Sequence, residues 1–485
     1  MVSLKSLFPR QYNWPILALV LIAFRMMFIN ISWSSYFAVA FSLYQFSLLF
    51  DSIGKFIPTR HLFGSLMCLQ FFIGPSLAYN GLDAYQYFMY QMKIPEGEYF
   101  AYAIPAVMAF IIGLHLRAEH EQGERLDLEA IRAFEKRNPL VGPVLIGVGF
   151  MASLVSRFFS AELEFIFYLI GSFKFIGLFL LIIGEKKLNW VAMVLVLGSI
   201  VSSSLGTGMF HDLLTWIIYS SAILAQKLNI GIRIKLIGLF VFIFLATTIQ
   251  LLKSDYRLTA LQSQDKAGIE TFAQLYQHEN ETQGVFNFEK MAQSNVRINQ
   301  GFIITNIMNT VPEKVPFANG SELAELLEAA FLPRFLAPDK LKAGDRSIFK
   351  KYSGIPIASG TSMGLSSLGD AYVNFGIAGG VLFMFLLGFM YSEILRFFFR
   401  SQRMFPLIVI FSPLVFYYPI RPDCELHTIL GHLFKSIVVI FTVFLGWRHV
   451  FQVNATAAFP VHRQRKSTFP NSPAQASDQQ KSVVP

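Results

Sequence analysis

The sequence predicts an all-α, polytopic membrane protein with about twelve transmembrane helices and one large, partly helical extracytoplasmic loop. Hydrophobic residues make up 54% of its 485 residues, and charged residues only 15%. The mean hydropathy is +0.49. Because soluble domains carry about a quarter charged residues, this composition excludes a soluble protein.

Twelve near-continuous apolar runs divide the chain, and each is bounded by charged residues, proline or glycine. A helix of about 20 apolar residues crosses the hydrocarbon core of a bilayer, so twelve such helices account for roughly 240 residues. The predicted spans are 14–31, 33–50, 61–79, 98–116, 139–156, 163–183, 189–207, 209–226, 234–252, 371–395, 404–420 and 428–447.

The distribution of positive charge predicts the orientation of these spans. If the amino terminus is cytoplasmic, the cytoplasmic segments collect 22 Lys and Arg residues, whereas the short loops on the other side hold only Lys93, Arg157 and Arg421. Cytoplasmic loops carry an excess of Lys and Arg, so both termini are predicted to be cytoplasmic. The net charge of +9 therefore follows from membrane topology and gives no reason to expect a nucleic-acid partner.

The span pattern divides the chain into four regions. Residues 1–252 form a membrane domain with spans one to nine, and residues 371–447 add spans ten to twelve. Between them, residues 253–370 form an extracytoplasmic loop that is too long to be a simple connection. Residues 448–485 lack apolar periodicity and are rich in Pro, Ser, Gln and basic residues, which predicts a disordered cytoplasmic tail.

Two amphipathic helices are predicted within the loop. The first follows Asn319, where Glu322 completes a capping box, and Pro333 ends it. The pattern favours packing of its apolar face on the membrane domain over a role as a gating lid. The second predicted helix covers 295–308, where apolar residues recur at helical spacing.

Several stretches outside the spans resemble a known family. They are Arg297 before a polar helix, the run Phe331–Arg334, the run Pro338–Lys340, the stretch Ser366–Gly376 that leads into a Gly-rich span, and the triplet Arg421–Asp423. Together they resemble the bacterial oligosaccharide repeat-unit polymerases, the Wzy-type O-antigen and exopolysaccharide polymerases. The resemblance covers mainly residues 250–425 and the general layout of the spans.

This resemblance implies a glycosyltransferase of polysaccharide biosynthesis, acting in the production of lipopolysaccharide or exopolysaccharide. Such an enzyme transfers a growing oligosaccharide from undecaprenyl pyrophosphate onto a lipid-linked repeat unit at the outer face of the bacterial inner membrane. Its partners would be that lipid-linked oligosaccharide, the bilayer, a chain-length regulator and a flippase. A lipid-linked donor needs no nucleotide-binding domain, and no metal or cofactor motif is present, so none is predicted.

The leaving group in this reaction is a lipid pyrophosphate, which needs cations that stabilise its developing charge. Arginine suits this task because its guanidinium is always charged and binds phosphate through two parallel hydrogen bonds. The alternative for each arginine is an ion-paired or snorkelling surface side chain. The candidate substrate-binding residues outside the membrane are Arg157, Arg257, Arg297, Arg334, Lys340 and Arg421.

A general base must also lie near the acceptor hydroxyl. His427 opens the last span four residues after Asp423, and on a continuous helix residues at this spacing share a face. Asp423 would then orient the imidazole of His427, and these two are the candidate catalytic residues. The alternative is a polar cluster that caps the helix. His211 and Asp212 form a second His/Asp pair.

Two other functions remain open. A twelve-span secondary transporter of an amphipathic or anionic substrate fits the span count, but the long outside insertion and the shortage of intramembrane carboxylates count against it. An O-antigen ligase-like transferase, which moves a finished polymer onto another lipid, shares most features with a polymerase.

Overall fold

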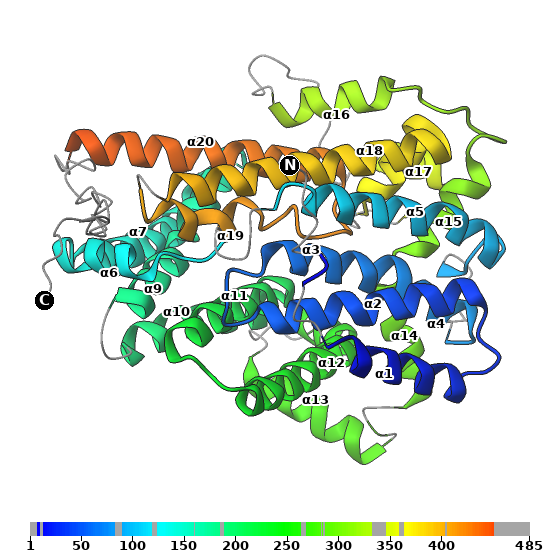
Figure 1. Cartoon of the computed structure of the whole chain (residues 1–485), viewed down its shortest axis with the longest axis horizontal. Coiled ribbons are helices and arrows are strands. Elements are labelled where there is room, and N and C mark those ends of the chain that lie inside the picture. The colour runs from blue at the N-terminus through cyan, green and yellow to red at the C-terminus, as the bar shows by residue number, and fades with distance from the viewer. Residues whose placement is uncertain are drawn as a thin grey trace, which may run out of the picture.

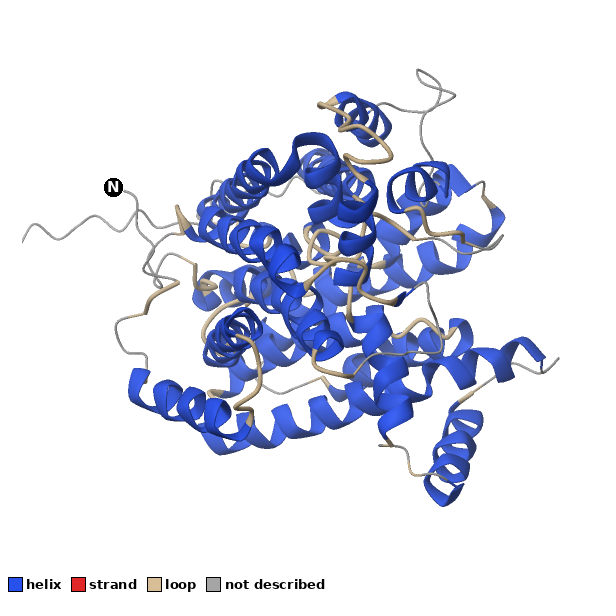
Figure 2. Cartoon of the chain, turned by 90° about the vertical axis from the view of Figure 1, so that its right-hand side faces the viewer, coloured by secondary structure: helices blue, strands red, loops and turns tan. Residues whose placement is uncertain are grey.

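The computed structural model is built from helices, and the part of the chain that it describes contains no strand (Figure 2). The structure describes residues 7–9, 13–82, 90–118, 124–159, 161–184, 189–262, 268–282, 284, 287–331, 346–357, 363–402 and 405–450. The predicted tail therefore lies outside the described residues from residue 451 onward.

Seven stretches of helix within the described residues are long and apolar enough to cross a membrane, as expected of a multi-pass membrane protein. The helices that form them are α3 (Thr59–Cys68), the π-helical turn η1 (Leu69–Ile73), α4 (Gly74–Tyr79), α5 (Glu96–His115), α8 (Ala161–Gly171), α9 (Phe173–Gly184), α10 (Trp190–Thr207), α12 (Ile232–Gln262), α18 (Ser366–Ser401) and α20 (Leu426–Val450).

The all-α class is confirmed, but the count of twelve spans is too high for the described residues. The count is seven, or eight if the bent pair of α6 (Leu128–Arg137) and α7 (Val141–Val155) crosses as one unit. These two helices meet at 84°. α7 has 15 residues and α1 (Trp14–Met27) has 14, so each is shorter than a usual spanning helix.

Three other predicted spans differ from the structure for two physical reasons. α2 (Trp33–Ser52) and α11 (His211–Leu228) are long enough, but their polar residues reduce their hydropathy below that of the seven spanning stretches. Between 404 and 420 the chain forms only short pieces, η4 (Ile408–Phe411) and α19 (Ser412–Val415). Three prolines in this stretch prevent a continuous helix.

The core of the membrane part is the close pairing of α5 with α18, which run side by side in Figure 1. A Cβ atom at Gly113 would lie 2.2 Å from the Phe385 carbonyl oxygen, and one at Gly388 would lie 2.1 Å from the Phe110 carbonyl oxygen. Only glycine permits this contact between backbones. Small residues are the usual means by which membrane helices approach closely.

The segment 253–370 is partly helical, as predicted. It contains α13 (Ile269–Thr282), α14 (Phe288–Ile298), α15 (Gly301–Thr310), α16 (Ser321–Phe331) and α17 (Arg346–Ser353). α16 confirms the predicted helix, and it packs along α20. Other contacts replace the predicted capping box: Asn374 of α18 accepts from the N–H of Leu323, and the carboxylate of Glu322 accepts from Lys351 and Tyr352. The predicted helix 295–308 is instead two helices, because the backbone becomes extended at Asn299 and the N–H of Gln300 donates to the Gln70 carbonyl at 3.1 Å.

The predicted domain boundaries at 252 and 370 both fall inside helices. α12 continues to Gln262, and α18 already starts at Ser366. α18 kinks at Gly376, where φ is +65° and the ring of Phe317 lies against the backbone. A side chain at that backbone conformation would be strained. α12 ends, and α18 and α20 begin, at the same end of the membrane part. We call this end the loop end.

Candidate functional site

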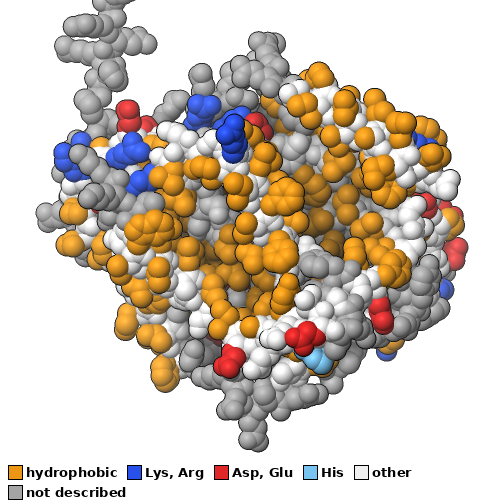
Figure 3. Space-filling view, turned by 90° about the horizontal axis from the view of Figure 1, so that it is seen from below, with side chains coloured by type: hydrophobic (Ala, Val, Ile, Leu, Met, Phe, Trp, Pro, Cys, Tyr) orange, Lys and Arg blue, Asp and Glu red, His pale blue; other side chains and the backbone are white. Residues whose placement is uncertain are grey.

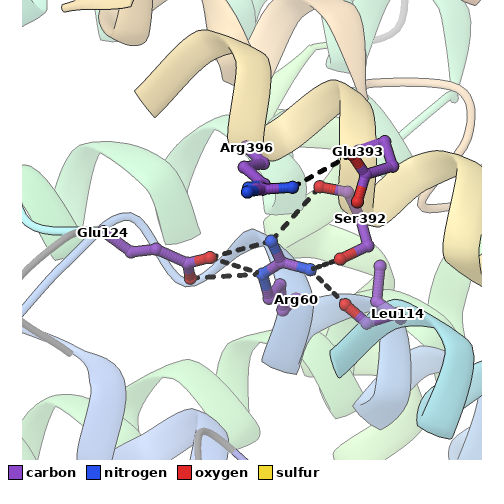
Figure 4. Close-up of polar contacts among 6 residues, drawn as sticks. All are labelled: Arg60, Leu114, Glu124, Ser392, Glu393 and Arg396. Atoms are coloured by element: carbon purple, nitrogen blue, oxygen red, sulfur yellow. Dashed lines mark hydrogen bonds and ion pairs between the residues drawn. The ribbon is translucent and has the colours of Figure 1, made fainter. Parts of the chain in front are cut away.

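Two groups of charged side chains stand out in the structure, and the first, which is buried, is centred on Arg60. This guanidinium is 4% exposed and forms an ion pair with Glu124 at 2.8 Å (Figure 4). Its other donors bond to the Leu114 carbonyl, the Ser392 hydroxyl at 2.8 Å and the Ser392 carbonyl at 3.4 Å. All five N–H groups of Arg60 are therefore used within the protein. This arrangement fastens α3, α5 and α18 together and leaves no donor for a ligand.

Replacing Arg60 by methionine is expected to destabilise the protein by about 3–5 kcal/mol, because it leaves the buried carboxylate of Glu124 without a counter-charge. The measurement is unfolding of the purified protein in a denaturing-detergent titration. Arg117→Met is the matched control, since Arg117 pairs with Glu393 at 3.6 Å but is 50% exposed. An exposed pair is worth at most about 1 kcal/mol. Equal losses in the two variants would contradict a structural role for Arg60.

The second group is a cluster of cations at the loop end, formed by Lys253, Arg257, Arg297 and Arg421. We call it the cationic cluster. Lys253 and Arg257 lie one turn apart on α12, Arg297 lies near the end of α14, and Arg421 lies between α19 and α20. The charges of the three arginines all act on Lys253. Partial burial and the charge of Arg257 lower the pKa of Arg297.

Local contacts hold two members of this cluster in place. The Nε–H of Arg257 donates to the Gly208 carbonyl at 3.0 Å, at the point where α10 ends in a left-handed glycine. Arg421 pairs with Asp423 at 3.2 Å, and its guanidinium lies 5.4 Å from the ring centre of Tyr418. The side chain of Arg421 is still 22% exposed. The guanidinium is thus oriented by its neighbours and remains accessible.

The pair of Arg421 and Asp423 is held in its charged form. Burial alone would raise the pKa of Asp423, but the charges of Arg421 and His211 lower it below its usual value. Burial alone would lower the pKa of Arg421, but the charge of Asp423 raises it above the usual range. The pair therefore stays ionised at neutral pH.

Aromatic and polar side chains surround the cluster on the side of the membrane helices. The ring centre of His211, at the start of α11, lies 6.2 Å from that of Tyr417. The charges of Arg421, Asp423 and Lys253 act on the imidazole. The predicted second pair, His211 with Asp212, is therefore part of this site. The structure brings it to the cationic cluster from a different part of the chain.

His427 lies near the cluster in a separate small cavity. Its side chain is buried in the first turn of α20, and the cavity is lined also by Asp370 and Glu425. The apolar residues that cover it come from α16 and α17, among them Leu326 and Phe349. Arg421 and Glu425 are four residues apart, so at most about 14 Å separates their Cα atoms. The cavity and the cationic cluster therefore belong to one region.

The structure does not join Asp423 to His427 as the spacing predicts. α20 begins at Leu426, so Asp423 lies in the preceding turn and pairs with Arg421. The carboxylate nearest to the imidazole is Glu425, whose Oε1 lies 3.7 Å from Nε2 of His427. The Oδ2 of Asp370 accepts a hydrogen bond from the N–H of Leu426 at 2.9 Å, which fixes the start of α20 beside α18.

The other predicted binding residues are less well placed by the structure. Arg157 lies in the short helix η3 (Ser156–Phe158), and its side chain is not among those described. Arg334 and Lys340 lie outside the described residues. Of the six predicted substrate-binding residues, the structure thus brings together Arg257, Arg297 and Arg421.

Three residues of the region were missed from the sequence: Lys253, Asp370 and Glu425. Lys253 precedes Arg257 by four residues, so the two share a helix face if the helix of the predicted span 234–252 continues past its apolar run. Asp370 directly precedes the predicted span 371–395, the usual position of a helix cap, but in the structure it lies one turn inside α18. Glu425 sits next to the predicted start of the last span, and nothing in the pattern distinguishes it from Asp423.

The four cations outnumber the carboxylates that act on them, Asp255 and Asp423, so the cluster suits a multiply charged anion. Phosphate groups fit best because a guanidinium can bind two of their oxygens. A histidine with two carboxylates in an adjoining cavity can accept a proton from a bound hydroxyl. The combination suits a group transfer in which a phosphate leaves and a hydroxyl attacks.

Comparison with known proteins gives a family but no function. No curated protein and no solved structure matches the chain. The model of one family, described as a domain of unknown function (DUF8712), matches residues 56–445. This range contains Arg60, the cationic cluster and the His427 cavity. Because the match covers most of the chain, the protein belongs to the DUF8712 family.

Proposed function

We propose that the protein is a membrane glycan polymerase. It transfers a growing oligosaccharide from undecaprenyl pyrophosphate onto a lipid-linked repeat unit. The observation that carries this proposal is the convergence of Lys253, Arg257, Arg297 and Arg421 at the loop end. Half-buried cations such as Lys253, Arg257 and Arg421 cost free energy unless an anion compensates them. Asp423 pairs with Arg421, and the charge of Asp255 acts on Arg297. The resemblance to repeat-unit polymerases supplies the identity of the anion.

In this proposal the loop end faces the outside of the bacterial inner membrane, and both termini are cytoplasmic. Arg233 and Lys235 at the start of α12, and Arg396 and Arg400 near the end of α18, lie at the end of the membrane part opposite the loop end. This excess of cations there supports the orientation. A lipid pyrophosphate keeps its polyprenyl chain in the bilayer and its head group at the surface. In this proposal such a head group lies at the same depth as the end of α12 and the start of α20. A chain-length regulator and a flippase are the proposed protein partners.

The proposed reaction divides the work between the two parts of the region. The cationic cluster binds the pyrophosphate of the donor lipid and stabilises the charge that develops when the sugar–phosphate bond breaks. His427, with Glu425 beside it, accepts the proton of the acceptor hydroxyl as the new glycosidic bond forms. The products are the elongated lipid-linked glycan and free undecaprenyl pyrophosphate.

Incubation of the reconstituted protein with a synthetic lipid-linked repeat unit tests the proposal. A ladder of products differing by one repeat unit is expected. In sealed vesicles, the ladder should form on the side from which a membrane-impermeant thiol reagent labels Ser321→Cys. Ser321 is an exposed residue at the start of α16, and the substitution is made after replacing both native cysteines with serine. Transfer of a whole preformed polymer to a second lipid would identify a ligase instead. The absence of any transfer would overturn the proposal.

A further inference from the structure

The membrane part of α12 is the least covered of the seven spanning stretches. Only 11% of its apolar window is buried inside the protein, compared with 72% for the stretch Glu164–Gly184. Its strongest helix contacts are with α13 and α14, which lie outside the spans. Polar bonds fasten its two ends, from Lys235 to the Ile53 carbonyl and from Tyr256 to the Leu205 carbonyl. α12 is therefore attached at its ends and stands apart in between.

The side of α12 that is turned inward is apolar and incompletely filled. Leu239, Phe242 and Ala246 recur at helical spacing and are half-buried, while Phe240 on the opposite side is 77% exposed. No residue from Ile232 to Thr247 is fully buried. A span packed on every side would bury such a stripe, whereas this stripe is left partly open.

The surface that carries α1 and α12 agrees with this description. These helices lie in the lower part of Figure 1, with α13 below them, and the view from below in Figure 3 shows a largely hydrophobic surface with a hollow near its centre. The stripe leads directly to the cationic cluster, because Lys253 and Arg257 follow on the same helix. Leu239 and Lys253 are 14 residues apart, which is roughly 21 Å along the helix axis.

A half-open apolar helix face that leads to a group of cations fits one kind of ligand, a long hydrocarbon chain with a multiply charged anionic head. We infer that the inward side of α12, from Leu239 to Ala246, seats the polyprenyl chain of a lipid pyrophosphate whose head group lies in the cationic cluster. The inference rests on the proposed function for the identity of the head group. Because α12 is fastened only near its ends, a chain can enter sideways from the bilayer.

Binding of two probes to the protein in phosphatidylcholine nanodiscs tests this seat. The probes are inorganic pyrophosphate and geranylgeranyl pyrophosphate, which share a head group and differ in the chain. Ala246→Trp would fill the space beside α12, so we expect at least a tenfold loss of affinity for geranylgeranyl pyrophosphate and none for inorganic pyrophosphate. Leu239→Trp should act in the same way. Phe240→Trp, on the side that faces the lipid, is the matched control and should change neither affinity.

Three outcomes would overturn the seat: unchanged binding of geranylgeranyl pyrophosphate in both Ala246→Trp and Leu239→Trp, an equal loss for both probes, or displacement of geranylgeranyl pyrophosphate by phosphatidylglycerol. The last would identify ordinary membrane lipid as the occupant. Thermal unfolding of each variant shows whether it retains the fold. If the expected binding pattern appears but the wild-type protein forms no ladder, the seat stands and the polymerase proposal fails.

Discussion

Replacing Arg421 by alanine is expected to reduce polymerisation about a hundredfold to a thousandfold, the usual effect of removing one preorganised donor from a developing oxyanion. Arg421 is the member of the cationic cluster whose guanidinium is oriented by Asp423 and Tyr418 while its side chain stays partly exposed. Its removal also leaves Asp423 as an unpaired negative charge that repels a pyrophosphate. The measurement is the initial rate of ladder formation with purified protein.

Arg421→Lys separates charge from geometry. Lysine keeps the positive charge and an ion pair with Asp423, but it cannot form two parallel bonds to one phosphate. A loss of at least tenfold is therefore expected, which corresponds to about 1.4 kcal/mol of transition-state stabilisation. Arg400→Ala is the control, because Arg400 is an exposed arginine at the far end of α18. Activity of Arg421→Ala above half that of the wild type would exclude it from the site.

The sequence predicted the class of fold because apolar runs report directly on burial in lipid. It overestimated the number of spans because a run of apolar residues does not reveal where a helix breaks. Pro413 lies inside the predicted span 404–420, yet the composition of that stretch resembles that of an intact span. α2 shows the opposite case, since its buried Ser42 and Gln45 pack within the protein and are too polar for a helix surrounded by lipid.

The candidate site could be predicted in its composition but only partly in its pairing. The arginines were selected by residue type and by side of the membrane, and three of them do converge. The pairing of Asp423 with His427 assumed a helix that starts before residue 423. Because of Pro422 and the turn after it, α20 begins only at Leu426. The carboxylate beside the imidazole is therefore that of Glu425 and not that of Asp423. Spacing rules hold only inside an element whose start is known.

Replacing His427 by glutamine is expected to lower the rate of polymerisation about a hundredfold or more, because positioned proton transfer is typically worth about 10²–10⁴ in rate. The imidazole is buried in a cavity with Glu425 and Asp370, and Glu425 lies 3.7 Å from its Nε2. Glutamine is polar and of similar length, so it preserves the start of α20 but cannot accept a proton. The measurement is the initial rate across a range of pH.

The pH profile distinguishes a base from a packing residue. A histidine base works only when it is neutral, so the wild-type rate should fall on acidification, and this fall should disappear in His427→Gln. Glu425→Gln should lower the rate less, since it removes the neighbouring charge but leaves the imidazole in place. His278→Gln, in exposed α13, is the control and should match the wild type. If His427→Gln polymerises normally, the proton must go to His211 beside the cationic cluster, or the arginines must drive the reaction by positioning the two lipids alone.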